Sequence, residues 1–490
     1  MTDSSAHIRE PQDRAPHLPE PHDGFVDQAT VPETRGIELI DDTERHGRAR
    51  DLFFVWAAPG ISVLNLTVGA SLTIVLGLEI WQALLVLALA SILSVLPGIV
   101  AISGPAAGTS GSVIQRAIYG IRGNKIVVAF YGWFISGVFL ALNWVAAAFM
   151  GGELLTRWGF PDPTIAAVIV AIVTAAITVV VAVYGHALIL RAYTAIAIAL
   201  TVIFALVMAF IAPSLDWGFS QPAPLSGLPL WVSLTVAFAI FSSSPLSFSN
   251  SADMARYLPS STKSSSVIWA TTLGNVFPGV FITAFGIVLG GTVGAESLEF
   301  GIEYSILEKL PVWLVPLFVL GVIVNTIALN GMTTYTASMA LQSIGVPIRR
   351  IPSAILIGVL GAAFTIVLVV SSSLIEAINL MLQFLLVISA PTMAVYVTDI
   401  VLRRNRYDGI DLFDERPGAK FWYTGGFGIP GLISVIAGGV ATALFLSTTV
   451  WIGPLGAAVG GLDLSVPVGL LVSVVAYVVL AGPGIRRQLA

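Results

Sequence analysis

The feature that most constrains the fold of this 490-residue chain is a series of long apolar segments separated by short polar ones. A helix needs about 20 apolar residues to cross the ~30 Å hydrocarbon core of a bilayer. We identify twelve segments of this kind: 52–76, 81–103, 126–152, 164–184, 187–212, 229–257, 266–291, 311–343, 353–371, 373–401, 428–448 and 464–484. Ten-residue strands of alternating polarity, the signature of a membrane barrel, are absent from the sequence. The sequence predicts an all-α polytopic membrane protein with twelve transmembrane helices.

Composition excludes several classes of function. Only 10% of the residues are charged and 56% are hydrophobic, against about 25% charged in ordinary soluble domains. A soluble enzyme and a nucleic-acid-binding protein are therefore excluded, and the expected partners are the lipid bilayer and a small-molecule substrate. The chain has no cysteine, so disulfides and thiolate metal sites are excluded as well. We expect no cofactor and no bound metal.

Basic residues predict the orientation. If the N-terminus is cytoplasmic, fifteen lysines and arginines fall in cytoplasmic connections and only Arg157 and Lys309 fall outside. This bias follows the positive-inside rule and predicts a multi-pass protein of the cell membrane with both termini cytoplasmic. Residues 1–50 are polar, contain five prolines and lack the features of a signal peptide. We expect them to form a largely flexible cytoplasmic tail.

Two predicted spans contain interruptions at membrane depth. In the first span the interruption is the stretch 56–65, which contains Pro59-Gly60 and ends at Asn65. In the sixth span it is the serine-rich run 241–250 around Pro245. Breaks at matching places in two inverted halves indicate the midplane binding site of a secondary transporter. Proline kinks packed against neighbouring helices are the alternative. The transporter interpretation predicts a first repeat over 51–212, a second over 213–401, and two peripheral helices with a short cytoplasmic C-terminus over 402–490.

Polar side chains within other spans are further candidates. Glu376, Asn379 and Gln383 share one helical face, and Glu376 is a candidate proton carrier because ionisable groups within spans are rare. Asn143 either binds a ligand or joins two helices. Span eight carries a group of polar residues, too many for a single interhelical contact: Asn325, Thr326, Asn330, Thr333 and Thr334.

Two acid–base pairs stand at predicted cytoplasmic helix ends. Asp253 precedes Arg256 by three residues, and Asp399 precedes Arg403 by four. These spacings predict ion pairs that act either as structural salt bridges or as an inner gate.

Several strings resemble the purine–cytosine permease family, the nucleobase:cation symporter-1 group. They run in order along the chain: Glu44-Arg45-His46-Gly47 with Asp51-Leu52-Phe53, Gln115-Arg116 with Tyr119–Asn124, Ser251–Pro259, Tyr335-Thr336-Ala337-Ser338, and Ala390-Pro391 through Asp399 to Tyr407. The resemblance implies the LeuT-type fold, with a 5+5 inverted repeat, two peripheral helices and alternating access. It also implies a flat ring held between aromatic residues of helices three and six, with amides and hydroxyls at its edge.

The sequence departs from that pattern at the aromatic positions. The helix-three position falls on Val138, with Phe139 next to it, and the helix-six position falls on Ser244. If the register is shifted, Phe139, Trp144 or Phe241 occupies one of the aromatic positions. The substrate-binding candidates are Ser62, Asn65, Val138, Phe139, Asn143, Phe241, Ser243, Ser244, Asn330 and Gln383.

The implied sodium site departs from the family as well. Its helix-one carbonyls map to Ala58 and Ile61, but its helix-eight hydroxyl positions map to Ala328 and Leu329, which have no side-chain oxygen for a hard cation. Thr326 or Thr333 supplies a hydroxyl if the register moves. The coupling ion is therefore either sodium or a proton, the latter carried by Glu376 or another carboxylate.

The expected function is secondary active import of a nucleobase or a related nitrogen heterocycle, such as cytosine, a purine, hydantoin or allantoin. We expect the transport to be cation-coupled, with the identity of the ion left open by the residues at the sodium positions. The alternative is the same fold carrying another small polar solute, a vitamin or an amino-acid-like compound, with proton coupling or none. The sequence shows no glycine-rich nucleotide loop, which argues against ATP-driven transport. Its oligomeric state is not predicted.

Overall fold

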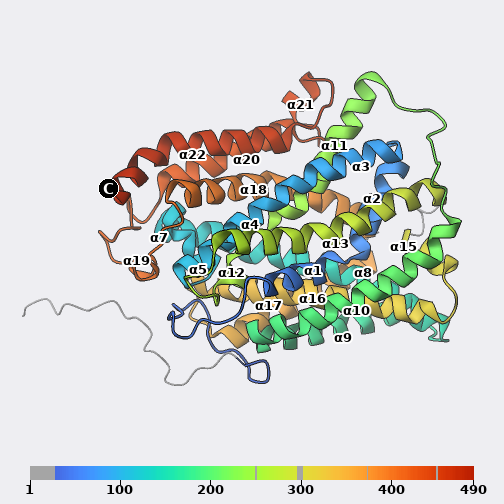
Figure 1. Cartoon of the computed structure of the whole chain (residues 1–490), viewed down its shortest axis with the longest axis horizontal. Coiled ribbons are helices and arrows are strands. Elements are labelled where there is room, and N and C mark those ends of the chain that lie inside the picture. The colour runs from blue at the N-terminus through green and yellow to red at the C-terminus, as the bar shows by residue number, and fades with distance from the viewer. Residues whose placement is uncertain (1–27, 249–250, 295–301, 372–373, 449–450) are drawn as a thin grey trace, which may run out of the picture.

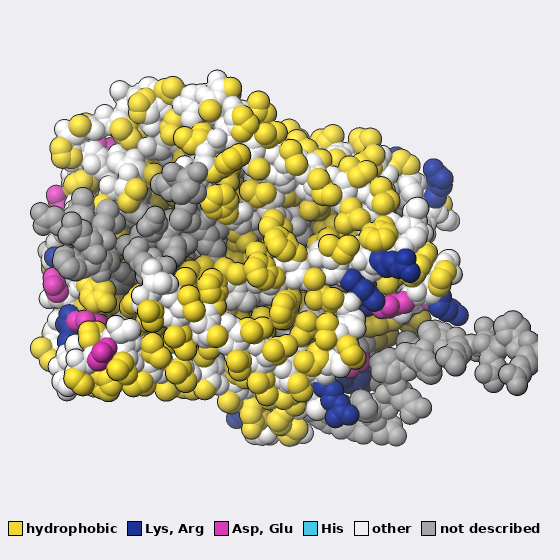
Figure 2. Space-filling model, turned by 180° about the vertical axis from the view of Figure 1, so that it is seen from behind, with side chains coloured by type: hydrophobic (Ala, Val, Ile, Leu, Met, Phe, Trp, Pro, Cys, Tyr) yellow, Lys and Arg dark blue, Asp and Glu magenta, His cyan; other side chains and the backbone are white. Residues whose placement is uncertain are grey.

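The computed structural model describes residues 28–248, 251–294, 302–371, 374–448 and 451–490. Within these ranges the chain is helical apart from loops and two isolated β-bridges. The long helices lie side by side along the long axis of the molecule (Figure 1). Apolar side chains cover the length between the two ends, and charged side chains gather at the ends (Figure 2). This distribution suits a bundle whose middle lies in hydrocarbon.

The predicted spans correspond to helices or helix series in chain order. The first half comprises α1 (Asp51–Gly60) and α2 (Val63–Ile74); α3 (Ile80–Ser91), η1 (Ile92–Ser94), α4 (Val95–Ala101) and α5 (Ser103–Ala107); α6 (Gly111–Ile114), α7 (Arg116–Val127), η2 (Val128–Phe134) and α8 (Ile135–Arg157); α9 (Pro163–Tyr184); and α10 (His186–Ile211) with η3 (Ala212–Ser214). The second half comprises α11 (Gly227–Ser247), α12 (Ala252–Ala255), α13 (Ser264–Val293), α15 (Ile302–Lys309), α16 (Leu314–Ser343), α17 (Arg350–Ser371) and α18 (Leu374–Leu402). The chain continues through α19 (Gly409–Phe413), α20 (Ile429–Phe445), α21 (Pro454–Ala458) and α22 (Ser465–Leu489).

The count of twelve spans is not confirmed by helix length. In the described part of the chain, ten helices are long and apolar enough to cross a membrane, and the bent pair α1–α2 makes eleven. The remaining predicted span corresponds to α20, which has 17 residues. A length of 17 residues is the lower limit for a spanning helix. The helix is shorter than the predicted span 428–448 because the backbone at Leu446 is extended.

The first span is broken where the sequence predicts it. Helices α1 and α2 meet at an angle of 54° around Ile61 and Ser62. The break in the sixth span comes later than the serine run suggests, since α11 continues through Pro245 and ends at Ser247. Helix α12 then begins at Ala252.

The segment 28–50 is packed against one end of the bundle. This end, called the basic end below, holds α5, α7, α12 and α19 (Figure 1). The Glu33 side chain is fully buried there, and the Ile40 amide donates to the Gly108 carbonyl at 2.8 Å. Asp42 accepts hydrogen bonds from the amide and hydroxyl of Ser260, which hold the pKa of Asp42 below its usual range. The expected flexible tail thus does not extend through residue 50; residues 1–27 lie outside the described residues.

Close packing of small residues joins α2 to α13. A Cβ atom at Gly286 of α13 would lie 2.9 Å from the Leu66 Cα of α2, too close for a side chain. Membrane helices associate through such small residues because lipid provides no hydrophobic force between them. This contact fixes the second half of the broken span against the seventh span.

We therefore expect Gly286→Ala to destabilise the folded protein by about 1–3 kcal/mol, the usual cost of overpacking a tight contact. The measurement is the unfolding temperature of the detergent-purified protein. The matched control is Gly484→Ala in α22, where an added Cβ meets nothing within 4 Å. Equal unfolding temperatures for Gly286→Ala and wild type would contradict this packing.

Candidate functional site

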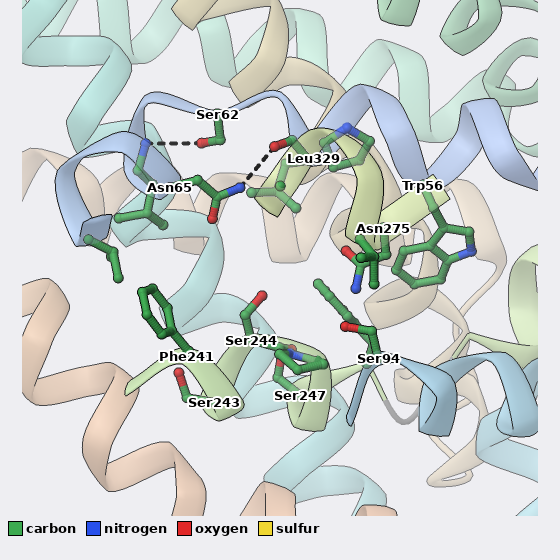
Figure 3. Close-up of a pocket in the computed structure, with 18 of the residues that line it drawn as sticks. Trp56, Ser62, Asn65, Ser94, Phe241, Ser243, Ser244, Ser247, Asn275 and Leu329 are labelled. Carbon is green, nitrogen blue, oxygen red and sulfur yellow. Dashed lines mark hydrogen bonds between the residues drawn. The ribbon is translucent and has the colours of Figure 1, made fainter. Parts of the chain in front are cut away.

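A cavity of about 210 Å³ lies between the broken first span and the helices around it. Its lining comes from α1, α2, α3, η1, α8, α11, α12, α13 and α16. Figure 3 shows Ser62 and Asn65 on one side and Phe241, Ser244 and Ser247 on the other. Residues that are far apart in the sequence therefore face one central space.

The break between α1 and α2 is held by side-chain hydrogen bonds. The Ser62 hydroxyl accepts from the Leu64 amide at 3.1 Å and caps α2. The Asn65 amide donates to the Gly60 carbonyl at 2.8 Å. From α16, the Asn325 amide donates to the carbonyls of Ala58 and Pro59 at 2.9 and 3.1 Å. These bonds satisfy carbonyls at the end of α1 that the bend leaves without helical partners.

Most of the residues predicted to bind substrate line this cavity. They are Ser62, Asn65, Phe139, Asn143, Phe241, Ser243 and Ser244. Ser244 is exposed to the cavity and makes no hydrogen bond through its own hydroxyl in the described part of the chain. Asn143 donates to the Asn330 side-chain oxygen at 2.9 Å, so it both lines the cavity and joins two helices.

Two predicted substrate-binding residues are placed differently, and the position of a third is not tested. Val138 is not among the lining residues, whereas Phe139 is. The π-helical segment η2 precedes them and adds a residue to the turn, which shifts a register counted from Gly123-Asn124 by one position. Asn330 is fully buried and donates to the Leu140 carbonyl at 2.9 Å, so it packs α16 against α8 instead of facing the cavity. The Gln383 side chain lies outside the described residues.

Among the lining residues that sequence reasoning missed are two aromatic and two polar ones. Trp56 and Phe248 line the cavity with their ring centroids 5.0 Å apart and their planes at 65°. Ser94 of η1 and Asn275 of α13 also line it and make no hydrogen bond through their side chains within the described ranges. Trp56 could have been identified from the sequence, because it lies three residues before Pro59 at the predicted break. Ser94 and Asn275 stand alone in apolar segments, and only the packing of their helices identifies them.

The residues mapped to the implied sodium site supply few side-chain oxygen atoms. The Ala58 carbonyl already accepts the Asn325 amide, and the Ala328 carbonyl accepts the Tyr193 hydroxyl. Thr326 is buried outside the cavity and Leu329 lines it with an apolar side chain. The Ala58 carbonyl keeps a second lone pair, and the Thr333 hydroxyl lines the cavity, so these oxygen atoms are the ones a cation could use. The Ile61 position at the break supplies only its backbone, and the Glu376 side chain lies outside the described residues.

One of the two predicted ion pairs forms and the other does not. Arg403 donates to Asp399 at 2.8 Å, and Tyr407 and Tyr477 also donate to that carboxylate. Asp253 instead accepts the Gly111 amide at 2.7 Å, and Arg256 pairs with Glu33 at 2.9 Å. The i, i+3 spacing fails here because Glu33, from the N-terminal segment, offers Arg256 a second carboxylate that sequence distance conceals.

Glu33 lies at the centre of a buried polar cluster at the basic end. Its carboxylate accepts from Arg256, from the Tyr257 hydroxyl at 2.8 Å and from the His186 amide at 2.8 Å. Arg350 lies 3.4 Å from the same carboxylate. The N-terminal segment therefore joins α10, α12 and α17 at this end.

Comparison with known proteins places the chain in a family. The family described as permeases for cytosine/purines, uracil, thiamine and allantoin matches residues 39–469. The chain belongs to this family. It is 26% identical over 470 residues, 93% of this chain, to YxlA of Bacillus subtilis (strain 168), which is named as a purine-cytosine permease; the match covers 97% of that relative.

Solved transporters share the architecture. The chain resembles the nucleobase-cation-symport-1 transporter Mhp1 in a closed conformation with bromovinylhydantoin bound, with a TM-score of 0.69 and 17% identity over 94% of this chain and 96% of that one. A Na⁺-coupled sialic acid symporter matches with a TM-score of 0.58 and 12% identity, over 90% of each chain. The permease therefore has the all-helical LeuT-type fold predicted from the sequence.

We expect Ser244→Trp to fill part of the central cavity and to weaken binding of the permease's substrate by at least about tenfold, or about 1.4 kcal/mol. The measurement is equilibrium binding to the purified protein. Ser265→Trp on the exposed start of α13 is the matched control. Unchanged affinity in Ser244→Trp would place the substrate elsewhere.

Proposed function

We propose that this permease is a secondary transporter that carries a neutral nitrogen heterocycle, a nucleobase or a close relative, across the cell membrane by alternating access. One observation carries the choice of substrate class. Among the described residues that line the central cavity, none is charged, while the polar ones are serines, threonines and asparagines. Such a lining offers hydrogen bonds without a counter-ion, which suits a neutral polar ring.

The aromatic lining supports a flat substrate. Trp56, Phe139, Phe241 and Phe248 all line the cavity, so four ring systems are present although Val138 and Ser244 occupy the positions mapped from the family. A planar heterocycle packs on such faces, and its edge needs donors and acceptors. We assign the edge contacts to Ser94, Ser244 and Asn275, because their side chains have unused hydrogen-bonding capacity in the described structure.

The alternative substrate is a vitamin or an amino-acid-like compound. An amino acid carries an ammonium and a carboxylate, and burying either without an opposite charge is unfavourable. The described lining offers no opposite charge to either group. This argument favours the neutral heterocycle over the zwitterion.

We infer that the basic end faces the cytoplasm, following the positive-inside bias of the sequence. Glu33, Arg256 and Arg350 then form an inner gate that keeps this end closed. Opening toward the cytoplasm requires separating these buried charges. Loss of one partner from such a cluster typically costs about 3–5 kcal/mol, which gives the gate its strength.

A proton is the coupling ion that the site supports best. The Asn325 amide engages the carbonyl to which the sodium position maps, and the helix-eight positions Ala328 and Leu329 supply no hydroxyl. A proton needs only a carboxylate that can release it on either side.

The test of this function is a thermal-shift screen of the purified protein against nucleobases, hydantoins, vitamins and amino acids, each with and without sodium. Ligand at about 100 times its Kd should stabilise the fold by about 2.7 kcal/mol. We expect a shift with a neutral base or hydantoin that is the same in sodium and in choline. A change in unfolding temperature with an amino acid alone, or no change with any heterocycle, would overturn the assignment.

Glu33→Gln tests the inner gate. The neutral amide leaves Arg256 and Arg350 without a full counter-charge, so we expect the basic end to open more often. A cysteine introduced at Thr336, which lines the cavity, should react several-fold faster with a hydrophilic maleimide applied from that side. Asp41→Asn is the control, since Asp41 is exposed on the same segment and its carboxylate accepts from the amide and hydroxyl of Thr43. Unchanged reactivity in Glu33→Gln would mean that Glu33 is a static anchor.

A further inference from the structure

A second, smaller cavity lies beside the central one. Its volume is about 50 Å³, and it shares Ser136, Phe139, Ser247 and Thr336 with the central cavity. Its remaining lining includes three buried polar residues, Ser112, Gln115 and Asp253. The two cavities therefore touch the same four side chains, and Asp253 lies one residue layer away from the substrate space.

The Asp253 carboxylate is buried without an ion pair. The residue is 1% exposed, and its only hydrogen bond in the described structure joins one oxygen to the Gly111 amide. Arg256, the basic residue nearest in sequence, is directed to Glu33 and to the Gly36 carbonyl. Burying an ionised carboxylate without an opposite charge is unfavourable, and such a group takes up a proton or a cation instead.

An unused acceptor lies in the same cavity. The Gln115 side-chain oxygen is buried and has no hydrogen-bond donor among the described residues. A carboxylate has no proton to give, but a protonated carboxyl group is a donor. A proton on Asp253 removes its need for a counter-charge and turns its carboxyl group into a donor inside the cavity that Gln115 also lines.

Other titratable and charged groups surround Asp253. They are Arg256 and Tyr257 on its own turn, Tyr131 of η2, Tyr396 of α18, His186 of α10 and Arg45 beside α5. None of them forms an ion pair or a hydrogen bond with the Asp253 carboxylate in the described part of the chain. Two of them are engaged elsewhere: Tyr131 donates to the Ser247 carbonyl and His186 contacts the Met254 carbonyl.

We propose that Asp253 is the carrier of the coupling proton, which it takes up and releases through the small cavity beside the substrate site. The proposal rests on the proposed transport function and names its ion site. Protonation removes the negative charge that holds the Gly111 amide, so it loosens the contact between α12 and α6. The same four shared side chains transmit the substrate's presence to this carboxyl group. Proton and substrate then favour each other's binding, as linkage requires.

The first experiment needs no substrate. Infrared difference spectra of the purified protein over a pH titration should contain the C=O stretch of a protonated carboxyl group, and Asp253→Asn should remove that band. Asp463→Asn is the matched control, because Asp463 is a buried carboxylate that accepts backbone amides far from this cavity. A band that persists in Asp253→Asn, or no titrating band in wild type, would overturn the proposal.

Gln115→Leu is the second variant and keeps the test valid if Asp253→Asn fails to fold. It removes the acceptor for the protonated form, so the band should remain while its titration midpoint moves to lower pH. An unmoved midpoint would show that Gln115 and Asp253 do not interact in the way proposed.

The last arm joins the proton to the substrate. In wild type, affinity for the base identified by the screen should rise about 5- to 150-fold as pH falls through the titration, the usual range of coupling between two sites. In Asp253→Asn this dependence should vanish. If affinity instead depends on sodium in wild type and this dependence is lost in Asp253→Asn, the proposal of a proton carrier would be overturned, and Asp253 would be assigned to sodium binding. The infrared result is readable even if every base fails to bind, so failure of the transport assignment and failure of this proposal are distinguishable.

Discussion

The rest of the structure depends on how the backbone of the broken first span is satisfied inside the membrane. Lipid offers no hydrogen bonds, so carbonyls released by the 54° bend must find protein donors. Asn65 and Asn325 supply them, the first from α2 and the second from α16. The Asn325 amide also joins the broken span to the eighth span, and the central cavity is the space that remains beside the bend. A site for a polar molecule is thus a consequence of a backbone that cannot be exposed to lipid.

Buried charge provides a second level of organisation. Glu33 draws Arg256 and Arg350 together at the basic end, whereas the Asp399–Arg403 pair holds the end of α18. Such clusters are costly to break once they are dry. The two differ in one respect that matters for transport. The first joins the helices to the N-terminal segment 28–50, and the second joins residues four apart at the C-terminal end of α18. Separation of the first cluster releases that segment from α10, α12 and α17, so we place the gate there.

Much of the fold was predictable, because spans and their breaks follow from local composition. Runs of apolar residues predict helices, and Pro59-Gly60 predicts the bend that the structure contains. The pairing of Arg256 was not predictable, since its partner Glu33 lies 223 residues away in a polar stretch that resembles a flexible tail. The position of Phe139 was obscured for a different reason. A π-helical insertion shifts the face of a helix by one residue, and no composition rule signals it.

The most direct test of the account is substrate protection of a single cysteine, because the chain has no cysteine of its own. Ser244→Cys places one thiol on the wall of the central cavity, and Ser265→Cys places one on the exposed start of α13. The rate of modification by a small thiosulfonate reagent is measured in membranes with and without a nucleobase or hydantoin. The account predicts that one of these heterocycles slows modification of the cavity cysteine and leaves the exposed one unaffected. Equal rates at Ser244→Cys with and without every heterocycle would contradict a substrate site between the broken helices.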